Sequence, residues 1–582
     1  MNDVAVMIGG RAGDGSLASG EILASVFAKM GLEVCTIKDF PSNIRGLPTN
    51  YTIRGREKLF LSRKDHIDFL IALDEVAVEQ HIGELPKDGV LIYDSSGGDI
   101  PEDLKRSGIH TYLAPMEKMA VDNLGGSSGR IFKNLISLGV LGGLIGLDEE
   151  LLKETVEKMF GRKGKEVVDK NIQAYRMGVE YVSKNLKKTD PYILKRRKKK
   201  DKLLITGDEA IGLGALAAGC RFYAGYPITP ATEIMEWAAH NFPKYNGVVV
   251  QSEDEIAAIH MVIGASYCGA RAMTGTSGPG ASLMTEAVGL AGMTETPIVI
   301  MHGQRAAPGT GLPTKSEQAD IEHALYSTHG DFPRIILSPG TIVEAFYFIV
   351  EAFNLAERYQ CPVILLSEQM LCQNKHTVDK LDLKKMKIDR GKLLTEDDLK
   401  KIKDYKRYQF TEDGISPRSM PSLENGLFEA NSNEHDEYGG TTEDLETRRR
   451  MMRKRLKKLE VAKKDLIEPK VFGDEAADIG IIGMGSTYGP IKTAMEQLAE
   501  EDISVKYLQI RMLKPFPYDS VKKFVDSCSR IYVVEHNATG QLARQIMYRL
   551  GLSEYTEKFR SILRYDGRGF RPIEIVEGVK RR

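Results

Sequence analysis

The sequence has no clustered cysteines and no excess of charge of either sign. Its 582 residues include six cysteines without a CxxC pair, and the closest two are Cys361 and Cys372. Iron–sulfur clusters and structural zinc sites need grouped thiolates, so neither is expected within this chain. Lysine and arginine number 80 against 81 aspartates and glutamates. This balance makes nucleic acid and anionic membranes unexpected partners.

Long apolar runs and the pattern of a secretory leader are also missing. No stretch of about 20 apolar residues occurs, so no transmembrane helix is expected. The first residues, MNDVAVMIGG, have no basic region and enter a glycine turn directly, which argues against a leader. Scattered cysteines without a leader predict a cytoplasmic location.

The length and composition predict several globular domains. The hydrophobic fraction is 42% and the charged fraction 28%, both typical of soluble globular proteins. At roughly 150 residues per domain the chain is long enough for about four. Strand–turn–helix units recur along it, which predicts a multi-domain α/β fold. We expect five parts: 1–186, a basic linker at 187–202, 203–375, a charged inserted arm at 376–473, and 474–582.

Apolar segments bounded by turns predict the strands of three α/β regions. The charge run at 187–202 is interpreted as a linker rather than a nucleic-acid patch, because a new α/β pattern starts at Leu203. Small residues over 256–292 predict helices packed closely on a sheet or on another subunit. The expected strands are 4–8, 69–72, 90–93, 248–251, 298–302, 362–366, 479–482, 505–509 and 531–535.

The segment Tyr226-Pro227-Ile228-Thr229-Pro230 predicts a rigid loop. Two prolines separated by two residues disfavour both a helix and a central strand. The threonine between them can present its hydroxyl from this loop, and a helix is expected from about Ala231. A simple helix-entry turn is the alternative.

Three further motifs follow, two of them at the ends of predicted strands. Ser252-Glu253-Asp254-Glu255 leads from a strand into a helix, where its acids also suit the helix dipole. Thr274-Gly275-Thr276-Ser277-Gly278-Pro279-Gly280 is a loop of small residues before another helix. Gln304-Arg305-Ala306 follows a strand, and Gly309-Thr310-Gly311-Leu312-Pro313-Thr314 comes soon after.

Together these four motifs resemble the pyrimidine-binding domain of the 2-oxoacid:ferredoxin oxidoreductases, a thiamine-diphosphate enzyme family. The resemblance extends over nearly the whole chain. Residues 1–186 resemble the family's gamma domain, with Asp14 where that family usually has Gln and with Arg45-Gly46 matching. Residues 474–582, with the EHNATG segment at 535–540, resemble a transketolase C-terminal-like domain. Asp436 to Gly439 resembles a loop of the alpha subunit.

The resemblance implies the alpha subunit of a fused gamma–alpha enzyme. Such an enzyme decarboxylates a 2-oxo acid oxidatively with coenzyme A, giving acyl-CoA, CO2 and reduced ferredoxin, or runs in reverse as a synthase. 2-Oxoglutarate is the expected substrate, and pyruvate or a broad 2-oxoacid range stays open. A non-redox thiamine enzyme subunit and a non-catalytic scaffold are further alternatives, which the nature of the partner chain would distinguish.

The resemblance also assigns site residues. Glu255 would protonate the cofactor's pyrimidine ring, with Glu253 as the second choice. Thr229, Arg305 and Thr314 would bind the substrate, and arginine suits its carboxylate because the guanidinium matches it with two hydrogen bonds. The remaining residues expected around the cofactor are Tyr226, Pro227, Ile228 and Gly278.

Other parts of the implied machinery are assigned to a partner. A beta subunit would supply the diphosphate and Mg2+ site and a [4Fe-4S] cluster, in an (alpha–beta)2 assembly that reduces ferredoxin. Gly13-Asp14-Gly15 with Asn43 downstream has the look of a diphosphate–magnesium motif, but a lone glycine turn is a weak signal. It fits the gamma domain better, where it would either hold a phosphate of coenzyme A or serve structure alone.

Overall fold

A computed structural model describes residues 3–42, 46–198, 201–551 and 557–581. They form two compact units. The first contains Met1–Ile205 with Asn374–Lys380 and Arg571–Ile573, and the second contains the remainder. Expectations that involve Asn43, Arg45 or residues 199–200 of the linker lie outside the described residues. The expected five-part division stays a prediction.

The first unit is built on an eight-stranded mixed sheet in the order β6-β5-β4-β1-β3-β2-β14-β7. Strands β1, β4, β5 and β6 pair in parallel, and β3 runs antiparallel to both β1 and β2. Its strands are β1 (Asp3–Arg11), β2 (Glu33–Asp39), β3 (Pro48–Arg56), β4 (Phe69–Ala72), β5 (Val90–Asp94), β6 (His110–Ala114), β7 (Lys202–Thr206) and β14 (Lys375–Asp379).

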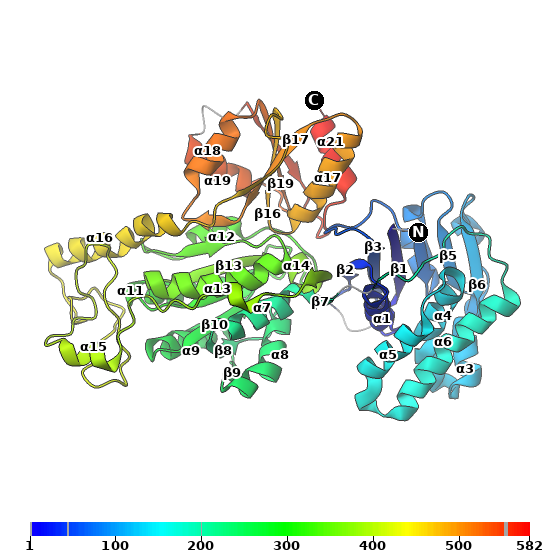
Figure 1. The fold of residues 1–582 in the computed structure, drawn as a ribbon, viewed down its shortest axis with the longest axis horizontal. Helices are drawn as coiled ribbons and strands as arrows, with labels where there is room; N and C mark the ends of the chain where they lie inside the picture. Colours follow the sequence, from blue (N-terminus) through cyan, green and yellow to red (C-terminus); the bar gives the residue numbers. More distant parts are fainter. Residues whose placement is uncertain (1–2, 43–45, 199–200, 552–556, 582) are drawn as a thin grey trace. The chain divides into compact units, whose positions relative to one another are not determined.

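Helices pack on this sheet and bury its central parallel strands β4 and β5 along their whole length. Strand β1 continues into the glycine turn, so helix α1 begins only at Ser16. Gly13 and Gly15 take φ values of 104° and 85° in that turn, which glycine adopts without strain. The helices are α1 (Ser16–Lys29), α2 (Glu75–His81), α3 (Met116–Asn123), α4 (Lys133–Ile145), α5 (Glu149–Phe160) and α6 (Lys165–Asn185), most of them labelled in Figure 1.

The second unit holds a seven-stranded sheet in the order β18-β12-β13-β11-β10-β8-β9. All its strands except β18 are parallel to their neighbours. The strands are β8 (Cys220–Gly225), β9 (Val248–Gln251), β10 (Arg271–Thr276), β11 (Val299–Gln304), β12 (Ile335–Leu337), β13 (Val363–Glu368) and β18 (Met512–Lys514).

Alternating side chains give this sheet two apolar faces, each covered by helices. Met273 and Leu365 pack in a core with α7, α8 and α13, whereas Ala272 and Ile364 pack in another with α9, α11 and α12. This period of two is what a strand buried on both faces requires. The helices are α7 (Gly207–Ala217), α8 (Thr232–Asn241), α9 (Glu255–Tyr267), α10 (Gly278–Leu283), α11 (Thr285–Met293), α12 (Ile321–Tyr326), α13 (Ile342–Tyr359) and α14 (Gln369–Gln373).

The C-terminal part of the second unit forms a five-stranded sheet in the order β15-β17-β16-β19-β20. Figure 1 shows it in orange and red, next to the green seven-stranded sheet. Its elements are β15 (Lys470–Gly473), β16 (Ile479–Met484), α17 (Tyr488–Glu500), β17 (Val505–Ile510), α18 (Tyr518–Asp526), β19 (Arg530–Glu535), α19 (Gln541–Leu550), β20 (Phe559–Leu563) and α21 (Pro572–Lys580). The predicted multi-domain α/β fold is confirmed. Among the described residues, no helix is long and apolar enough to cross a membrane.

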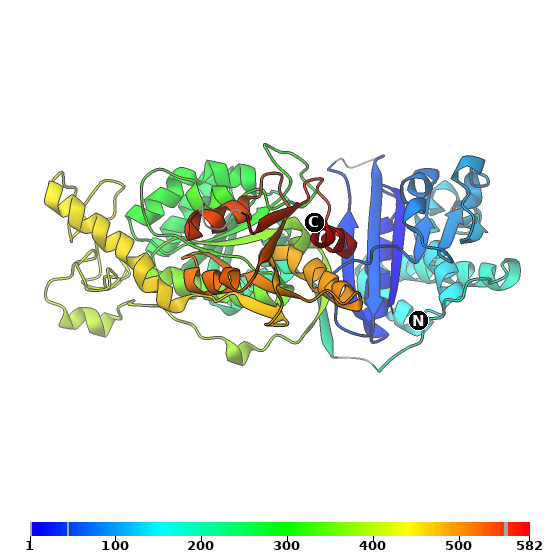
Figure 2. The same ribbon diagram turned by 90° about the horizontal axis from the view of Figure 1, so that it is seen from above.

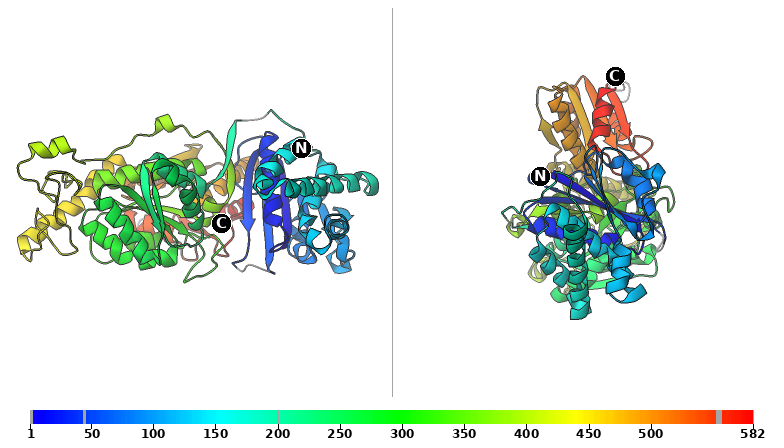
Figure 3. Two further views of the ribbon diagram at one scale, coloured as in Figure 1. Left: turned by 90° about the horizontal axis from the view of Figure 1, so that it is seen from below. Right: turned by 90° about the vertical axis from the view of Figure 1, so that its right-hand side faces the viewer.

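Along the sequence, the arm lies between the seven-stranded and the five-stranded sheet of the second unit. It carries helices α15 (Glu396–Lys401) and α16 (Leu445–Ala462) and much irregular chain, drawn in yellow and yellow-green in Figures 2 and 3. It is tied to the C-terminal end of α11. Arg407, Tyr408 and His435 donate hydrogen bonds to the carbonyls of Glu295, Thr294 and Met293 respectively. The arm thus satisfies backbone acceptors that the helix end leaves open.

The charged helix α16 is held by a buried ionic cluster. Lys454 and Lys458 donate hydrogen bonds to the two carboxylate oxygens of Glu295, at 2.6 and 2.5 Å, and all three side chains are almost inaccessible to solvent. Burial alone would raise the pKa of Glu295, but the two lysine charges outweigh it and hold this pKa well below its usual value. A helix of the charged inserted arm is therefore docked through buried charges.

Replacement of Glu295 by alanine is expected to destabilise the second unit by about 3–5 kcal/mol, because it leaves two buried lysines without their counter-charge. Urea unfolding of wild type and variant measures the difference. Glu446→Ala is the matched control. Glu446 pairs with Arg449 on the exposed side of the same helix, and its loss is expected to cost less than about 1 kcal/mol. Equal effects of the two substitutions would contradict the importance of the buried cluster.

Candidate active site

The four sequence motifs lie at one edge of the seven-stranded sheet. Each follows the carboxyl end of a parallel strand, and the strand register pairs Gly225 with Gln251, Thr276 with His302, and Gln304 with Glu368. Ligands of open α/β sheets bind outside the carboxyl ends of the strands. The edge formed by β8, β9, β10, β11 and β13 is therefore the candidate active site.

Arg305 and Thr229 are in direct contact at this edge. Nη1 of Arg305 donates a 3.0 Å hydrogen bond to the carbonyl oxygen of Thr229. The arginine is only 6% exposed, and its Nε has no hydrogen-bond partner among the described residues. Burial lowers the pKa of Arg305, although the charge of Asp320 opposes this. A buried guanidinium with an unused donor is suited to bind an anionic group.

Glu255 is buried at the first position of α9, whereas Glu253 is exposed. The helix N-cap is Asp254, whose side chain accepts a 2.7 Å hydrogen bond from the amide of Ala257. The carboxylate of Glu255 is thus not the one that caps the helix. Glu255 does lie in the first turn of α9, where its charge suits the helix dipole, but its burial makes it a better candidate than Glu253 for the residue that meets a ligand.

The small-residue segment packs on the carboxylate of Glu255, but it forms the end of β10 and the start of α10 rather than the predicted loop. A Cβ atom on Gly280 would lie 2.5 Å from Oε1 of Glu255 and 2.1 Å from Oγ1 of Thr276. Only glycine fits there. The hydroxyls of Thr274 and Ser277 are buried without a hydrogen-bond partner among the described residues. Buried polar atoms of this kind require an explanation, and a polar ligand supplies one.

The other predicted residues divide between surface and interior. Thr314 is buried, and its carbonyl accepts a hydrogen bond from Gln369 Nε2 at 3.2 Å. Tyr226 is 42% exposed, and Pro227 and Ile228 are half-buried. Gly278 lies against Asp320, since a Cβ on it would come within 2.8 Å of Oδ2 of that aspartate.

Two groups beside these residues have no role in the sequence prediction. Asp320 accepts a 3.0 Å hydrogen bond from Nε2 of His302, and its amide donates to Gln304 Oε1. Glu368, at the end of β13, accepts from Ser486 and Gln318 and is fully buried, which raises its pKa. No sequence motif indicated that residues of the C-terminal region, such as Ser486, contact this edge.

The glycine turn of the first unit is engaged within that unit. Asp14 accepts a 3.1 Å hydrogen bond from the amide of Arg11 and pairs with the buried Lys133 at 3.1 Å. Gly15 is the N-cap of α1. Whether this glycine turn holds a phosphate of coenzyme A or serves structure alone stays at the level of the sequence prediction.

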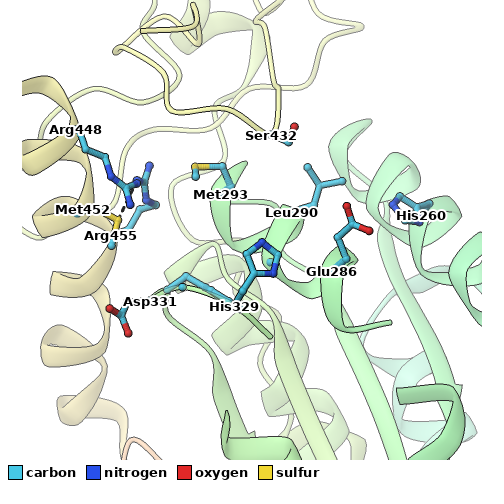
Figure 4. A pocket seen from close by; sticks show the side chains of 13 residues that line it. His260, Glu286, Leu290, Met293, His329, Asp331, Ser432, Arg448, Met452 and Arg455 are labelled. Atoms are coloured by element: carbon cyan, nitrogen blue, oxygen red, sulfur yellow. Dashed lines mark hydrogen bonds between the residues drawn. The ribbon is translucent and has the colours of Figure 1, made fainter. Parts of the chain in front are cut away.

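A separate cavity of about 440 Å3 opens elsewhere in the second unit (Figure 4). Its labelled side chains come from α9 (His260), α11 (Glu286, Leu290, Met293), the loop between α12 and β12 (His329, Asp331) and the arm. Two arginines of α16, Arg448 and Arg455, both pair with Glu434. No predicted site residue lines this cavity. Among the described residues, no group of three or more His, Cys, Asp or Glu is placed to hold a metal ion.

Family models match all three α/β regions of the chain. Residues 213–454 match the model described as "Pyruvate flavodoxin/ferredoxin oxidoreductase, thiamine diP-bdg". Residues 5–181 match "Pyruvate ferredoxin/flavodoxin oxidoreductase", and residues 477–575 match "Pyruvate:ferredoxin oxidoreductase core domain II".

Whole-length relatives agree with these models. The alpha subunit of 2-oxoacid:ferredoxin oxidoreductase 2 from Aeropyrum pernix is 32% identical, over 100% of this chain and 98% of the relative. The 2-oxoglutarate synthase subunit KorA of Archaeoglobus fulgidus is 38% identical over 59% of this chain and 90% of its own. The solved 2-oxoglutarate:ferredoxin oxidoreductase from Magnetococcus marinus, with 2-oxoglutarate, coenzyme A and succinyl-CoA bound, is 36% identical. It covers 100% of both chains with a TM-score of 0.91.

Proposed function

Since the chain belongs to the 2-oxoacid:ferredoxin oxidoreductases as an alpha-type subunit, we propose that its substrate is 2-oxoglutarate. The enzyme oxidises the 2-oxo acid in the presence of coenzyme A, giving succinyl-CoA, CO2 and two electrons for ferredoxin. The ligands of the Magnetococcus marinus relative include this substrate and this product, which supports the choice over pyruvate. The two relatives named 2-oxoacid:ferredoxin oxidoreductase and 2-oxoglutarate synthase fit the same chemistry.

The observation that carries the proposal is the buried Arg305, with an unused donor at the sheet edge. Its guanidinium would bind the carboxylate of the 2-oxo acid, and its contact with the Thr229 carbonyl fixes its orientation. Thr314, on the same loop, would add a hydrogen bond to the substrate.

The residues around Glu255 fit thiamine diphosphate. The cofactor, when bound, supplies the nucleophilic carbon that attacks the 2-oxo group. Glu255 would hold a proton at the nitrogen of its pyrimidine ring, which requires a carboxyl group in a dry site. A Cβ atom on Gly278 or Gly280 would meet the carboxylate of Asp320 or of Glu255, so glycine avoids a side chain against either acid, and Tyr226, Pro227 and Ile228 would also contact the cofactor.

We further propose a beta subunit that carries the diphosphate and Mg2+ site and a [4Fe-4S] cluster, in an (alpha–beta)2 assembly with ferredoxin as electron acceptor. Large apolar side chains are exposed on the neighbouring helices α9 and α10, at Ile256, Met261 and Leu283, and on the edge strand β9, at Val248. An exposed apolar group of this size is typical of a protein interface. A cytoplasmic location is proposed because all six cysteines are free thiols.

The purified chain alone is expected to show no 2-oxoacid oxidation. The complex that co-purifies with it from its native source is expected to reduce methyl viologen with 2-oxoglutarate and coenzyme A. Assays on a panel of 2-oxo acids measure the preference. Activity of the isolated chain would refute the need for a partner, and a higher kcat/KM with pyruvate would refute the substrate.

The change Glu255→Gln is expected to lower kcat of the complex by about 10²–10⁴-fold, the usual contribution of a positioned acid or base, because an amide cannot exchange the proton. Glu253→Gln is the matched control, two residues away and exposed, and is expected to leave kcat within about twofold. Subunit assembly, followed by size-exclusion chromatography, should not change in either variant. Loss of activity in Glu253→Gln with retention in Glu255→Gln would reverse the assignment.

The change Arg305→Ala is expected to raise KM for 2-oxoglutarate by about 10–100-fold, as the loss of a charged hydrogen bond of about 1.5–3 kcal/mol implies. KM for coenzyme A is expected to stay constant. Steady-state kinetics with each substrate varied in turn gives both values. Arg544→Ala, on the exposed side of α19, serves as the control. An equal rise in both KM values would argue against recognition of the 2-oxo acid by Arg305.

A further inference from the structure

The loop that carries Arg305 and Thr314 is closed on itself at its base. The amide of Ala306 donates to the carbonyl of Lys315 at 3.0 Å, and the amide of Leu312 donates to the carbonyl of Ala306 at 3.1 Å. Residues 308–312 at its tip are exposed. Gly311 permits the tight return, since a Cβ there would lie 2.0 Å from the carbonyl oxygen of Ala306. The loop is therefore compact, and its placement depends on what holds its base.

The C-terminal region holds that base through Gln318. The amide of Gln318 donates to the carbonyl of His536 at 2.6 Å, and the amide of His536 donates back to Gln318 Oε1 at 3.1 Å. Asn537 Nδ2 donates to the carbonyl of Gln318 at 3.2 Å. The first of these bonds joins main chain to main chain, and each of the other two joins a main-chain group to a side chain, so together they fix the direction of the loop as well as its distance.

The side-chain amide of Gln318 bridges both sheets of the unit. Its Nε2 donates to the carbonyl of Met484, at the end of β16, and to Oε1 of Glu368, at the end of β13, both at 2.9 Å. Gln318 is inaccessible to solvent. Glu368 is also bound by Ser486. The carboxyl ends of the two sheets thus meet at this one glutamine.

A second tie lies two residues earlier in the loop. The amide of Ser316 donates to the carbonyl of Gly567 at 3.1 Å. Gly567 has φ 76°, and a Cβ on it would lie 2.6 Å from Cβ of Lys315. The segment after β20 is therefore in close contact with Lys315, the residue that follows Thr314.

From these contacts we propose that Gln318 is a positioning residue: it latches the substrate loop to the C-terminal region, and through it places Thr314 and Arg305 for 2-oxoacid binding. This inference rests on the proposed function of that loop. A loop freed from the latch would have to be ordered by the substrate itself, and that ordering reduces affinity without altering the chemical step. The C-terminal region then has a part in substrate affinity, although it carries no predicted substrate residue.

Gln318→Met keeps the length of the side chain and removes the three hydrogen bonds that this side chain makes. The hydrogen bonds of the Gln318 main chain remain. In the assembled complex it is expected to raise KM for the 2-oxo acid about 5–20-fold, with kcat within about twofold and KM for coenzyme A unchanged. Hydrogen–deuterium exchange of residues 306–318 is expected to quicken at least about tenfold, while exchange in α13 stays the same.

Gln509→Met is the matched control. Gln509 is equally buried and joins β17 of the C-terminal sheet to helix α13 through a 2.8 Å hydrogen bond to Glu344, but it lies away from the loop. It is expected to cost similar stability and to leave both KM and loop exchange unchanged. Gly567→Ala tests the second tie and is expected to shift KM in the same direction as Gln318→Met, so that the test survives a folding failure of one variant.

Two results would overturn the latch: loop exchange that quickens without a rise in KM, or a KM that rises equally in Gln509→Met. Failure of the proposed function would give a different result. The wild-type complex would then oxidise no 2-oxo acid, although hydrogen–deuterium exchange of the loop would still be faster in Gln318→Met than in wild type.

Discussion

Parallel pairing of five strands, β8 to β11 and β13, is the constraint on which the rest of the second unit depends. Because these strands run in one direction, the segments that follow them all leave at the same edge. Motifs separated by up to about 80 residues along the chain are thereby brought together, as the hydrogen bond between Arg305 and Thr229 demonstrates. The position of the site residues therefore depends on the topology of the sheet more than on the conformation of any single loop.

Burial at this edge gives the individual side chains their distinct properties. Asp254 takes the N-cap of α9 and so leaves the adjacent Glu255 carboxylate to face the small-residue segment. Arg305 keeps an unused donor in a site where burial already lowers its pKa. Neighbouring residues of the same type, such as the exposed Glu253, lack these surroundings. The difference between a capping acid and a candidate catalytic acid is one position along the helix.

Charged and polar contacts, rather than apolar ones alone, attach the outer parts of the second unit to its central sheet. The arm is held by Glu295 with Lys454 and Lys458, and by side chains that complete the end of α11. The C-terminal region is held at Gln318. A buried ionic cluster adds little net stability compared with apolar packing but penalises every other arrangement. Such contacts are suited to parts whose exact placement matters.

Much of the fold and the outline of the site were predictable from local patterns. Strands such as 69–72 and 248–251 were placed to the residue, because apolar runs between turns leave few alternatives. The antiparallel strands β2 and β3 were missed, since Pro48–Arg56 mixes polar and apolar residues without clear alternation. Helix α16 was expected only as part of a charged inserted arm, because a run of lysines and arginines gives no sign that a single distant glutamate will bury two of them.

The sequence by itself determined the family, the α/β class and the candidate residues, because these depend on short motifs and on local periodicity. Only the tertiary structure decided which residues meet. The hydrogen bond of Arg305 to Thr229, the contact of Gly280 with the Glu255 carboxylate, and the bridge at Gln318 all join segments far apart in the chain. Such contacts depend on strand direction and on burial, neither of which a local pattern encodes.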